Sequence, residues 1–273
     1  MAEKLFCERG PLAYKLSVKK ETLKRSLRDR FSNEPIARTK SEMPLPCLLT
    51  SHSSVIVRRL AGVDLRMQEN KRTNLRLACE KLNGLVIRPG ETFSFWLTIG
   101  KPSKKNGYLE GLYIEHGKVG SGIGGGLCQM GNLIHYMVLH SALEVTELHH
   151  HSDALFPDER RRVPFGTGTS VSYNYIDYRF KNTGDHDVQL LVWTDDEELH
   201  GELRSAAEDP HSYELVEEDH HFSREGDAYF RNSKVYRLIR DKATGEVLKK
   251  ELLLENHSRV MYDPALIPPE QIR

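Results

Sequence analysis

The segment VGSGIGGGLCQMGNLIHYMVLH, residues 119–140, constrains the fold more than any other part of the chain. Five glycines lie between positions 120 and 126, and a glycine inside a helix costs about 1 kcal/mol relative to alanine. They therefore predict a turn in which backbone groups approach another part of the structure closely. Beyond the turn, apolar residues recur at helical spacing at Met130, Leu133, Ile134, Met137 and Val138. This stripe predicts a helix that packs on a core and begins near Cys128.

The flanking segments predict an α+β fold in which an antiparallel sheet packs against this central helix. Residues 68–84 have helical spacing and end in Asn-Gly, and residues 85–96 place a Pro-Gly turn before a strand. Further strands are expected at 169–182, 186–194 and 198–204, followed by a hairpin around residues 243–245 and a short strand at 257–262.

Composition divides the chain into three parts. Residues 1–54 form a polar N-terminal extension, residues 55–205 the core, and residues 206–273 a β-rich C-terminal extension of the same fold. Within the first part, a basic helix near 18–30 is followed by a Ser- and Pro-rich stretch, 32–54, that reads as a loop. We expect the basic helix to be solvated surface, although weak peripheral contact with an anionic membrane is also compatible with its charge.

Charge and hydropathy exclude several classes of protein. Lys plus Arg and Asp plus Glu both total 39, so net charge gives no indication of nucleic-acid binding. No apolar stretch reaches the length of a membrane span, and the first twenty residues lack the apolar core of a signal peptide. We therefore expect no transmembrane segment and a cytoplasmic location. The cysteines Cys7, Cys47 and Cys79 have no C-x-x-C spacing and are expected to be structural thiols.

Cys128 is the predicted nucleophile. A helix N-terminus favours the thiolate and lowers the pKa of a cysteine placed there. The glycine turn also leaves backbone N–H groups unobstructed beside the sulfur, so Gly124, Gly125 and Gly126 are predicted to contribute to an oxyanion hole formed by residues 124–128.

A histidine from the run LHHH is the predicted base. The segment LEVTELHHH alternates like a strand, which puts Val145, Glu147, His149 and His151 on one face. A strand that returns beside the cysteine helix brings His149 or His151 towards the thiol. Asp177 is the first candidate to orient the imidazole, and Glu147 is the second. Cysteine on a helix and histidine on a following strand is the layout of papain-like thiol enzymes.

Three other interpretations remain open. Cys128 is a small buried hydrophobe in the first, as most free cysteines are. In the second, the H-x-H pair His149 and His151 forms half of a zinc site that Cys128 or Asp177 completes. The third is a non-catalytic module that binds a peptide or glycopeptide through the glycine turn and the aromatic residues Trp96, Tyr108 and Tyr113.

The segments NLRLACEKLNGLVIRPGETFSFW, GGGLCQM and TELHHHS, in that order, resemble the VanW family, named from vancomycin-resistance gene clusters. The resemblance runs from about residue 55 to residue 262. It implies a peptidoglycan setting and, as assigned to some proteins with a VanW domain, an L,D-transpeptidase activity that acts through a cysteine. A link to glycopeptide antibiotic resistance is implied in the same way.

The resemblance assigns the family's cysteine to Cys128, with Gln129 beside it, and its His-Ser pair to residues 151–152. Glu91 and Ser94 are expected to shape the site. Many relatives have Asp-Ala-Thr where this chain reads Gly-Thr-Ser at 168–170, which leaves Asp177 as the predicted acid. The combined prediction is a cysteine acyltransferase or amide hydrolase that needs no cofactor or metal and acts on peptidoglycan-related peptides.

Overall fold

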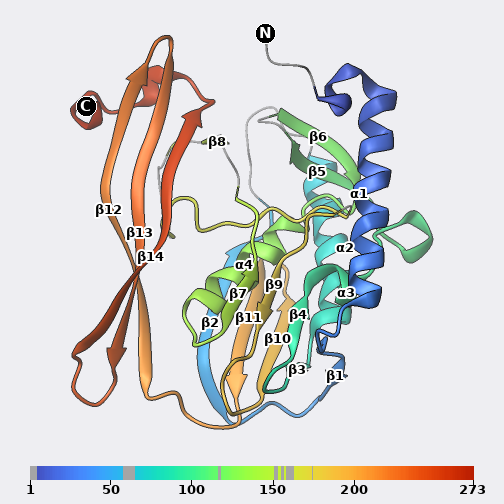
Figure 1. Ribbon diagram of the computed structural model, residues 1–273, viewed down its shortest axis with the longest axis vertical. Coiled ribbons are helices and arrows are strands. Elements are labelled where there is room, and N and C mark those ends of the chain that lie inside the picture. Colours follow the sequence, from blue (N-terminus) through green and yellow to red (C-terminus); the bar gives the residue numbers. More distant parts are fainter. Residues whose placement is uncertain are drawn as a thin grey trace.

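The computed structural model describes residues 5–57, 65–115, 118–150, 153–154, 157, 163–173 and 175–273. Helices and largely antiparallel sheets combine in an α+β fold, which confirms the predicted class. In Figure 1 the helices gather with the shorter strands in one body, and the three long strands β12 to β14 stand beside that body.

A five-stranded antiparallel sheet with the order β1-β3-β10-β11-β2 forms the base of the body. Its strands are β1 (Thr39–Lys40), β2 (Cys47–Val55), β3 (Leu85–Ile87), β10 (Val188–Thr194) and β11 (Glu198–Ser205). Because side chains alternate across a strand, β11 buries Leu199 and Leu203. The opposite face carries Trp193 and His200, whose rings stack with centroids 5.3 Å apart.

The helices α2 (Leu65–Leu82) and α4 (Cys128–Leu139) pack on this sheet, α2 against β10 and α4 against β2 and β11. Both helices confirm the predictions from periodicity, and the apolar stripe of α4 is buried. Gly201 of β11 allows the close approach of α4, because a Cβ atom there would lie 2.6 Å from Cε of Met137 and 2.8 Å from Cδ2 of Leu133. The helix that begins with Cys128 is therefore held tightly against the sheet.

A three-stranded sheet beside the core positions the acidic residues of the site. Its order is β4-β9-β7, with β4 (Thr92–Ser94), β7 (Glu144–Glu147) and β9 (Arg179–Lys181). The predicted Pro-Gly turn leads into β4, and Ser94 then caps the short helix α3 (Phe95–Ile99) by accepting a hydrogen bond from the N–H of Leu97. A hairpin of β5 (Glu110–Glu115) and β6 (Lys118–Ile123) precedes the glycine turn.

The C-terminal part forms a separate sheet of long strands. It contains β12 (His211–Glu225), β13 (Ala228–Asp241) and β14 (Val247–Val260), with the short strand β8 (Asp153–Ala154) parallel to β14. The predicted hairpin around residues 243–245 is confirmed, but residues 257–260 continue β14 instead of forming a strand of their own. Short 3-10 helices lie at Phe6–Arg9, Lys104–Asn106, Pro264–Leu266 and Pro269–Gln271.

Of the two local predictions for the N-terminal part, the loop is wrong and the surface helix is confirmed except at Arg25. Residues 47–55 are not a loop but form β2, which pairs along its length with β11. Serine and threonine are tolerated there because β2 is an edge strand whose residues are only partly buried. The basic helix is α1 (Pro11–Phe31), which has no fully buried residue and is largely solvated surface, as predicted. The exception is Arg25, whose side chain is 9% exposed and packs against the body.

Two predicted strands are shorter than expected. The strand β7 ends at Glu147, after a register shift between Val145 and Glu147, so His149 lies beyond it. Ser172 and Ile176 form an isolated antiparallel bridge, Tyr173 and Tyr175 lie in turns, and 179–181 are extended as β9. In the ranges that the structure describes, no helix is both long enough and apolar enough to cross a bilayer.

Candidate functional site

Cys128 is the first residue of α4 and packs at the edge of the core. The residue is partly exposed, and its thiol donates a hydrogen bond to the carbonyl oxygen of Val171 at 3.5 Å. Burial raises the pKa of the Cys128 thiol above its ordinary value, and backbone hydrogen bonds at Val171 and at Cys128 itself lower it by less. The predicted lowering of this pKa is therefore wrong, because desolvation outweighs the effect of the helix N-terminus. At neutral pH the resting group is a thiol.

Gly124, Gly125 and Gly126 form the predicted turn, in which two chain segments approach closely, whereas Gly120 and Gly122 lie in β6. A Cβ atom on Gly125 would lie 2.1 Å from the carbonyl oxygen of Gly111 in β5. Gly124 and Gly126 have φ angles of +82° and +96°, which residues with a side chain rarely adopt. Asn74 of α2 holds the turn in place, since its side-chain amide donates a hydrogen bond of 2.9 Å to the carbonyl of Gly125.

The N–H groups of residues 124–128 were predicted to hold an oxyanion. Those of Gly124, Gly125 and Leu127 already donate to carbonyl oxygens, at 3.0, 3.1 and 3.4 Å. Within the described chain, the N–H groups of Gly126 and Cys128 have no carbonyl or side-chain oxygen as acceptor. Of the five N–H groups, those of Gly126 and Cys128 are therefore the ones without an oxygen acceptor in the described chain.

His149 has no hydrogen bond to Cys128 within the ranges described. Its Nε2 is 3.1 Å from Oε1 of Glu147, and its carbonyl accepts a hydrogen bond of 2.7 Å from the N–H of Ser170. Ser170 precedes Val171, which accepts the thiol hydrogen bond, so His149 and Cys128 contact adjacent residues of one segment. His151 lies outside the described residues, and its role as base stays a prediction.

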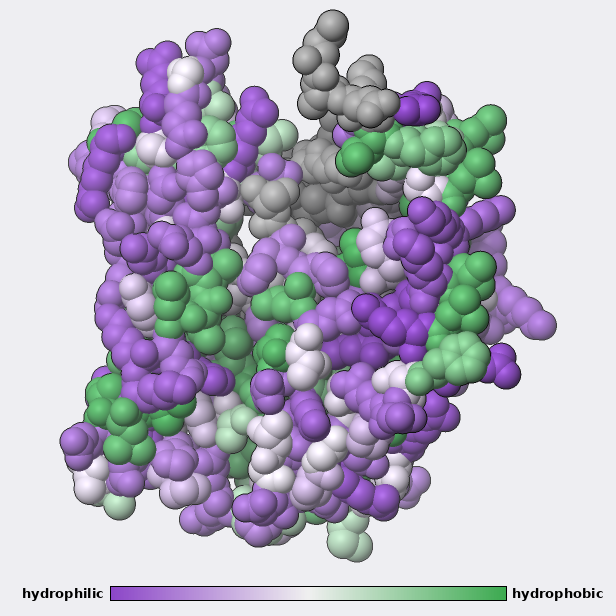
Figure 2. All heavy atoms as spheres, in the orientation of Figure 1, coloured by the Kyte–Doolittle hydropathy of each residue, from purple (hydrophilic) through white to green (hydrophobic). Residues whose placement is uncertain are grey.

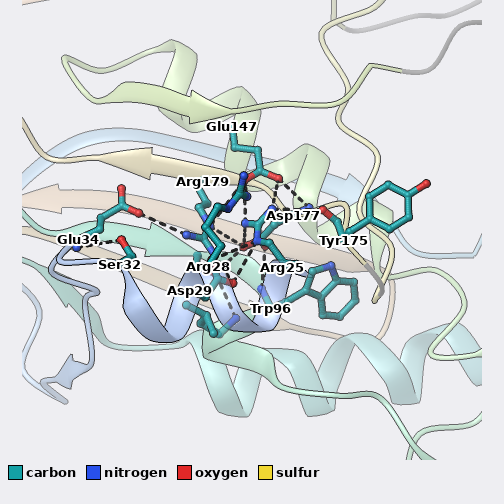
Figure 3. A network of polar contacts seen from close by, with 12 residues as sticks. Arg25, Arg28, Asp29, Ser32, Glu34, Trp96, Glu147, Tyr175, Asp177 and Arg179 are labelled. Carbon is teal, nitrogen blue, oxygen red and sulfur yellow. Dashed lines mark hydrogen bonds and ion pairs between the residues drawn. The ribbon is translucent and has the colours of Figure 1, made fainter. Parts of the chain in front are cut away.

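Asp177 is buried in a polar network, shown in Figure 3, and has no hydrogen bond to His149. Its carboxylate accepts hydrogen bonds from the side chains of Ser94 (2.6 Å) and Arg179 (2.9 Å), and from the backbone N–H groups of Trp96 (3.0 Å) and Tyr178 (2.9 Å). These donors occupy both carboxylate oxygens. Glu147, the second candidate from the sequence, is the acid that contacts His149.

Arg25 of α1 completes the network (Figure 3). Its Nη1 and Nη2 donate to the two carboxylate oxygens of Glu147 at 2.7 and 2.8 Å, and Nη2 lies 3.3 Å from Oδ2 of Asp177. A two-pronged pair of this kind has a specific geometry. Burial alone would raise the pKa of Glu147, but hydrogen bonds from Arg25 and His149 lower it below its ordinary value. Glu147 is therefore ionised at neutral pH.

The residues carried over from the family resemblance have structural contacts. Gln129 donates from Nε2 to the hydroxyl of Ser54 at 2.8 Å and so ties α4 to the end of β2. Glu91 accepts a hydrogen bond of 2.9 Å from the N–H of Arg88 and closes the turn before β4. Ser94 links the start of α3 to Asp177. These side chains position the segments around Cys128 and the network.

A cavity of about 540 Å³ lies between α1 and the turn that precedes β9. One wall is aromatic, with the rings of Trp96 and Tyr173 perpendicular at a centroid distance of 5.4 Å. Arg30 and Arg38 line the cavity and have no ion-pair or hydrogen-bond partner within the described chain. Its remaining lining residues are Thr22, Arg25, Ser26, Asp29, Ser32, Glu34, Ile36, Leu97, Tyr175 and Asp177. Cys128 is not among the lining residues, and its thiol contacts Val171, two residues before Tyr173.

The predictions for a binding module are corrected in part. Trp96 lines the cavity, but Tyr108 is buried, and Tyr113 packs over Gly120 and Gly122 of β6. No set of three or more His, Cys, Asp or Glu side chains among the residues described is arranged to hold a metal ion. The proposed zinc pair includes His151, which is outside those residues.

Sequence reasoning missed Arg25, Arg179 and the cavity tyrosines. The sequence predicts a strand over the segment YNY at 173–175. The alternation of a strand would place its two tyrosines on one face, and this was the available signal for the aromatic wall. An arginine in a basic helix gives no indication of a distant acidic partner.

Comparison with known proteins identifies relatives of the chain. A family model described as VanW like protein matches residues 70–204. The vancomycin B-type resistance protein VanW of Enterococcus faecalis (strain ATCC 700802 / V583) is 33% identical over 233 residues, which is 85% of this chain and 85% of that protein. The uncharacterized protein YoaR of Bacillus subtilis (strain 168) is 29% identical over 109 residues, 40% of this chain and 34% of that protein. No solved structure matches the chain.

Proposed function

The chain belongs to the VanW family, and from this premise we propose that it transfers or hydrolyses acyl groups of cell-wall-related peptides through Cys128. The supporting observation is the position of the sulfur at the start of α4, beside the N–H groups of Gly126 and Cys128 that have no oxygen acceptor in the described chain. Backbone N–H donors next to a nucleophile, without an oxygen acceptor of their own in the described chain, can stabilise a tetrahedral oxyanion.

In the proposed reaction, Sγ of Cys128 forms a bond to the carbonyl carbon of a substrate amide, and the thiol proton passes to a base. The carbonyl oxygen becomes an oxyanion held by the two N–H groups. When the C–N bond breaks, the base returns the proton to the leaving amine and a thioester remains on Cys128. Attack by a second amine completes a transfer, and attack by water completes a hydrolysis.

The raised pKa of Cys128 decides how the proton moves. Because the resting group is a neutral thiol, this mechanism does not start from the preformed ion pair of papain-like enzymes, and a base takes the proton during the attack. His149 is the described candidate, held by the ionised carboxylate of Glu147. His151 remains the second candidate, as the family resemblance implies. Asp177 supports this arrangement, since its N–H donates to Glu147 at 3.2 Å.

The proposal is tested with soluble muropeptides released from bacterial peptidoglycan by a muramidase. Intact-protein mass spectrometry after rapid acid quenching should detect a thioester adduct on the peptide that contains Cys128, and product analysis should show amide exchange or cleavage. Cys128→Ala should abolish both signals, and Cys47→Ala is the matched control that should retain them. Absence of adduct and product with the wild-type chain, or equal turnover by Cys128→Ala, would contradict the proposal.

The cavity supports a second candidate function, the binding of a cell-wall peptide without chemistry. An aromatic wall and two unpaired arginines suit a peptide that carries a carboxylate. In a titration of the same muropeptides followed by Trp96 fluorescence, in a Trp193→Phe background, Cys128→Ala should bind like the parent. Arg38→Gln should weaken binding by about tenfold, as expected for a lost charge-assisted contact. Unchanged affinity of Arg38→Gln would exclude the cavity as the binding site.

A further inference from the structure

The helix α1 exposes an apolar stripe on the face opposite to the one that docks on the body. Leu12, Leu16, Leu23 and Leu27 are 77, 58, 61 and 48% exposed. At about 100° per residue, these four leucines lie within about 60° of one another around the helix axis. Arg25, which anchors α1 to Glu147, lies on the opposite side. No residue of α1 is buried, so the stripe is not part of the core.

Lysines surround and interrupt this leucine stripe. Lys15, Lys19, Lys20 and Lys24 are exposed. In the described ranges Lys24 is the one of the four with an ion pair, a solvent-exposed contact with Glu21. Exposed leucines next to unpaired lysines are typical of helices that lie in a membrane interface. Figure 2 shows hydrophobic side chains between hydrophilic ones along the side of the molecule where α1 runs in Figure 1.

A second copy of the chain is a poor occupant for the leucine stripe. The centre of the stripe, midway between Leu12 and Leu27, falls at Lys19 and Lys20. A two-fold axis through this centre would place these lysines against the same lysines of the other copy, because a two-fold interface brings identical patches together. Like charges in contact are destabilising, so the stripe favours an anionic occupant.

We infer that α1 is a membrane-surface helix that binds a bilayer containing anionic phospholipid. Its leucines enter the boundary between headgroups and acyl chains, and the lysines contact lipid phosphates. The ion pair between Arg25 and Glu147 holds the body, with the cavity that Arg25 lines, on the other side of the helix. This inference does not depend on the chemistry proposed for Cys128.

Vesicle flotation with the full chain tests the inference. The wild type should float with vesicles of phosphatidylcholine and phosphatidylglycerol and remain unbound with phosphatidylcholine alone. The double variant L16S/L23S should lose binding by about tenfold or more, since each buried leucine contributes strongly to transfer. The variant K19Q/K20Q should also lose about 25-fold, at roughly fivefold per charge, and added salt should weaken the wild type.

Two controls separate this outcome from unfolding and from self-association. L248S/L252S removes two leucines of β14 with 52% exposure each, and its binding should equal that of the wild type. Circular dichroism should show that L16S/L23S keeps its fold. Equal flotation of L16S/L23S and wild type would overturn the inference. A dimer in solution that L16S/L23S dissociates, with no flotation of the wild type, would overturn it in favour of a second copy.

Discussion

Arg25 and Glu147, which are 122 residues apart in the sequence, form a two-pronged ion pair with N–O distances of 2.7 and 2.8 Å. The pair joins α1 to the end of β7, two residues before His149. It orients the carboxylate that contacts the histidine and keeps it ionised. The N-terminal helix is therefore part of the support of the candidate site.

Replacement of Arg25 tests this support. Arg25→Met should lower the free energy of unfolding by about 3 kcal/mol, because it removes the closest cation of α1 from the largely buried carboxylates of Glu147 and Asp177. Urea denaturation measures the change. Arg30→Met, on the same helix but without a partner in the described chain, should change stability by less than about 0.5 kcal/mol. Similar losses for both variants would contradict a specific role for the pair.

The lowered pKa of Glu147 predicts a loss of folding stability at low pH. Its pKa in the folded chain lies below the ordinary value, so the folded state binds fewer protons than the unfolded state. The stability it contributes is complete above the unfolded pKa near 4.3 and is lost as pH falls through the folded pKa. When the free energy of unfolding is measured by denaturation at pH values from 6 downwards, Glu147→Gln should lack the pH-dependent stability that the Glu147 carboxylate contributes. A stability difference between wild type and variant that stays constant below about pH 4 would count against it.

The lowered pKa of His135 predicts a second loss of folding stability, which begins at a higher pH than the loss caused by Glu147. Burial lowers the pKa of His135 to about 3, and its Nδ1 lies 3.1 Å from the hydroxyl of Tyr178. Between about pH 6.5 and 3 the unfolded chain binds a proton at this position and the folded chain does not, so the free energy of unfolding decreases as the pH is lowered. Over the first 1.5 pH units this costs about 1.5 kcal/mol. His135→Asn should flatten the stability profile in that window, and an unchanged slope would refute the assignment.

Cys128 should react slowly with iodoacetamide in the folded chain. Its raised pKa predicts that alkylation at pH 7 is slower in the folded chain than in the urea-unfolded chain, because the thiolate is the reactive form. Peptide mapping by mass spectrometry follows the rate, which should increase with pH. Cys79, whose pKa burial raises to about 12, is an internal reference for an unreactive thiol. Faster labelling of Cys128 in the folded chain would indicate an activated thiolate.

Gly125 should tolerate no side chain. Gly125→Ala places a Cβ atom 2.1 Å from the backbone of Gly111, and the resulting overpacking should lower the free energy of unfolding by about 3 kcal/mol. Gly184→Ala is the matched control, because its nearest neighbour would be Oδ1 of Asn182 at 3.4 Å. The free energy of unfolding of Gly184→Ala, measured by thermal denaturation, should lie within about 0.5 kcal/mol of that of the wild type. A small effect of Gly125→Ala would show that the turn can open.

Periodicity and glycine content were sufficient to predict the elements that carry Cys128. The apolar stripe of α4, the glycine turn before it, the helix α2 and the strands β10 and β11 are all encoded by residues close together in the sequence. Spacing reports which face of such an element is apolar, and a left-handed turn requires glycine wherever it folds. These features were therefore predictable without knowledge of their partners.

The charge states and contacts of the site were decided by the tertiary structure. Whether Cys128 is a thiolate depends on how much water its neighbours exclude, and here burial outweighs the helix N-terminus. The packing of β7 against β9 and the contact with Arg25 make Glu147, and not Asp177, the acid that contacts His149. Desolvation and ion pairing act between residues that are distant in sequence, so local sequence patterns do not predict them.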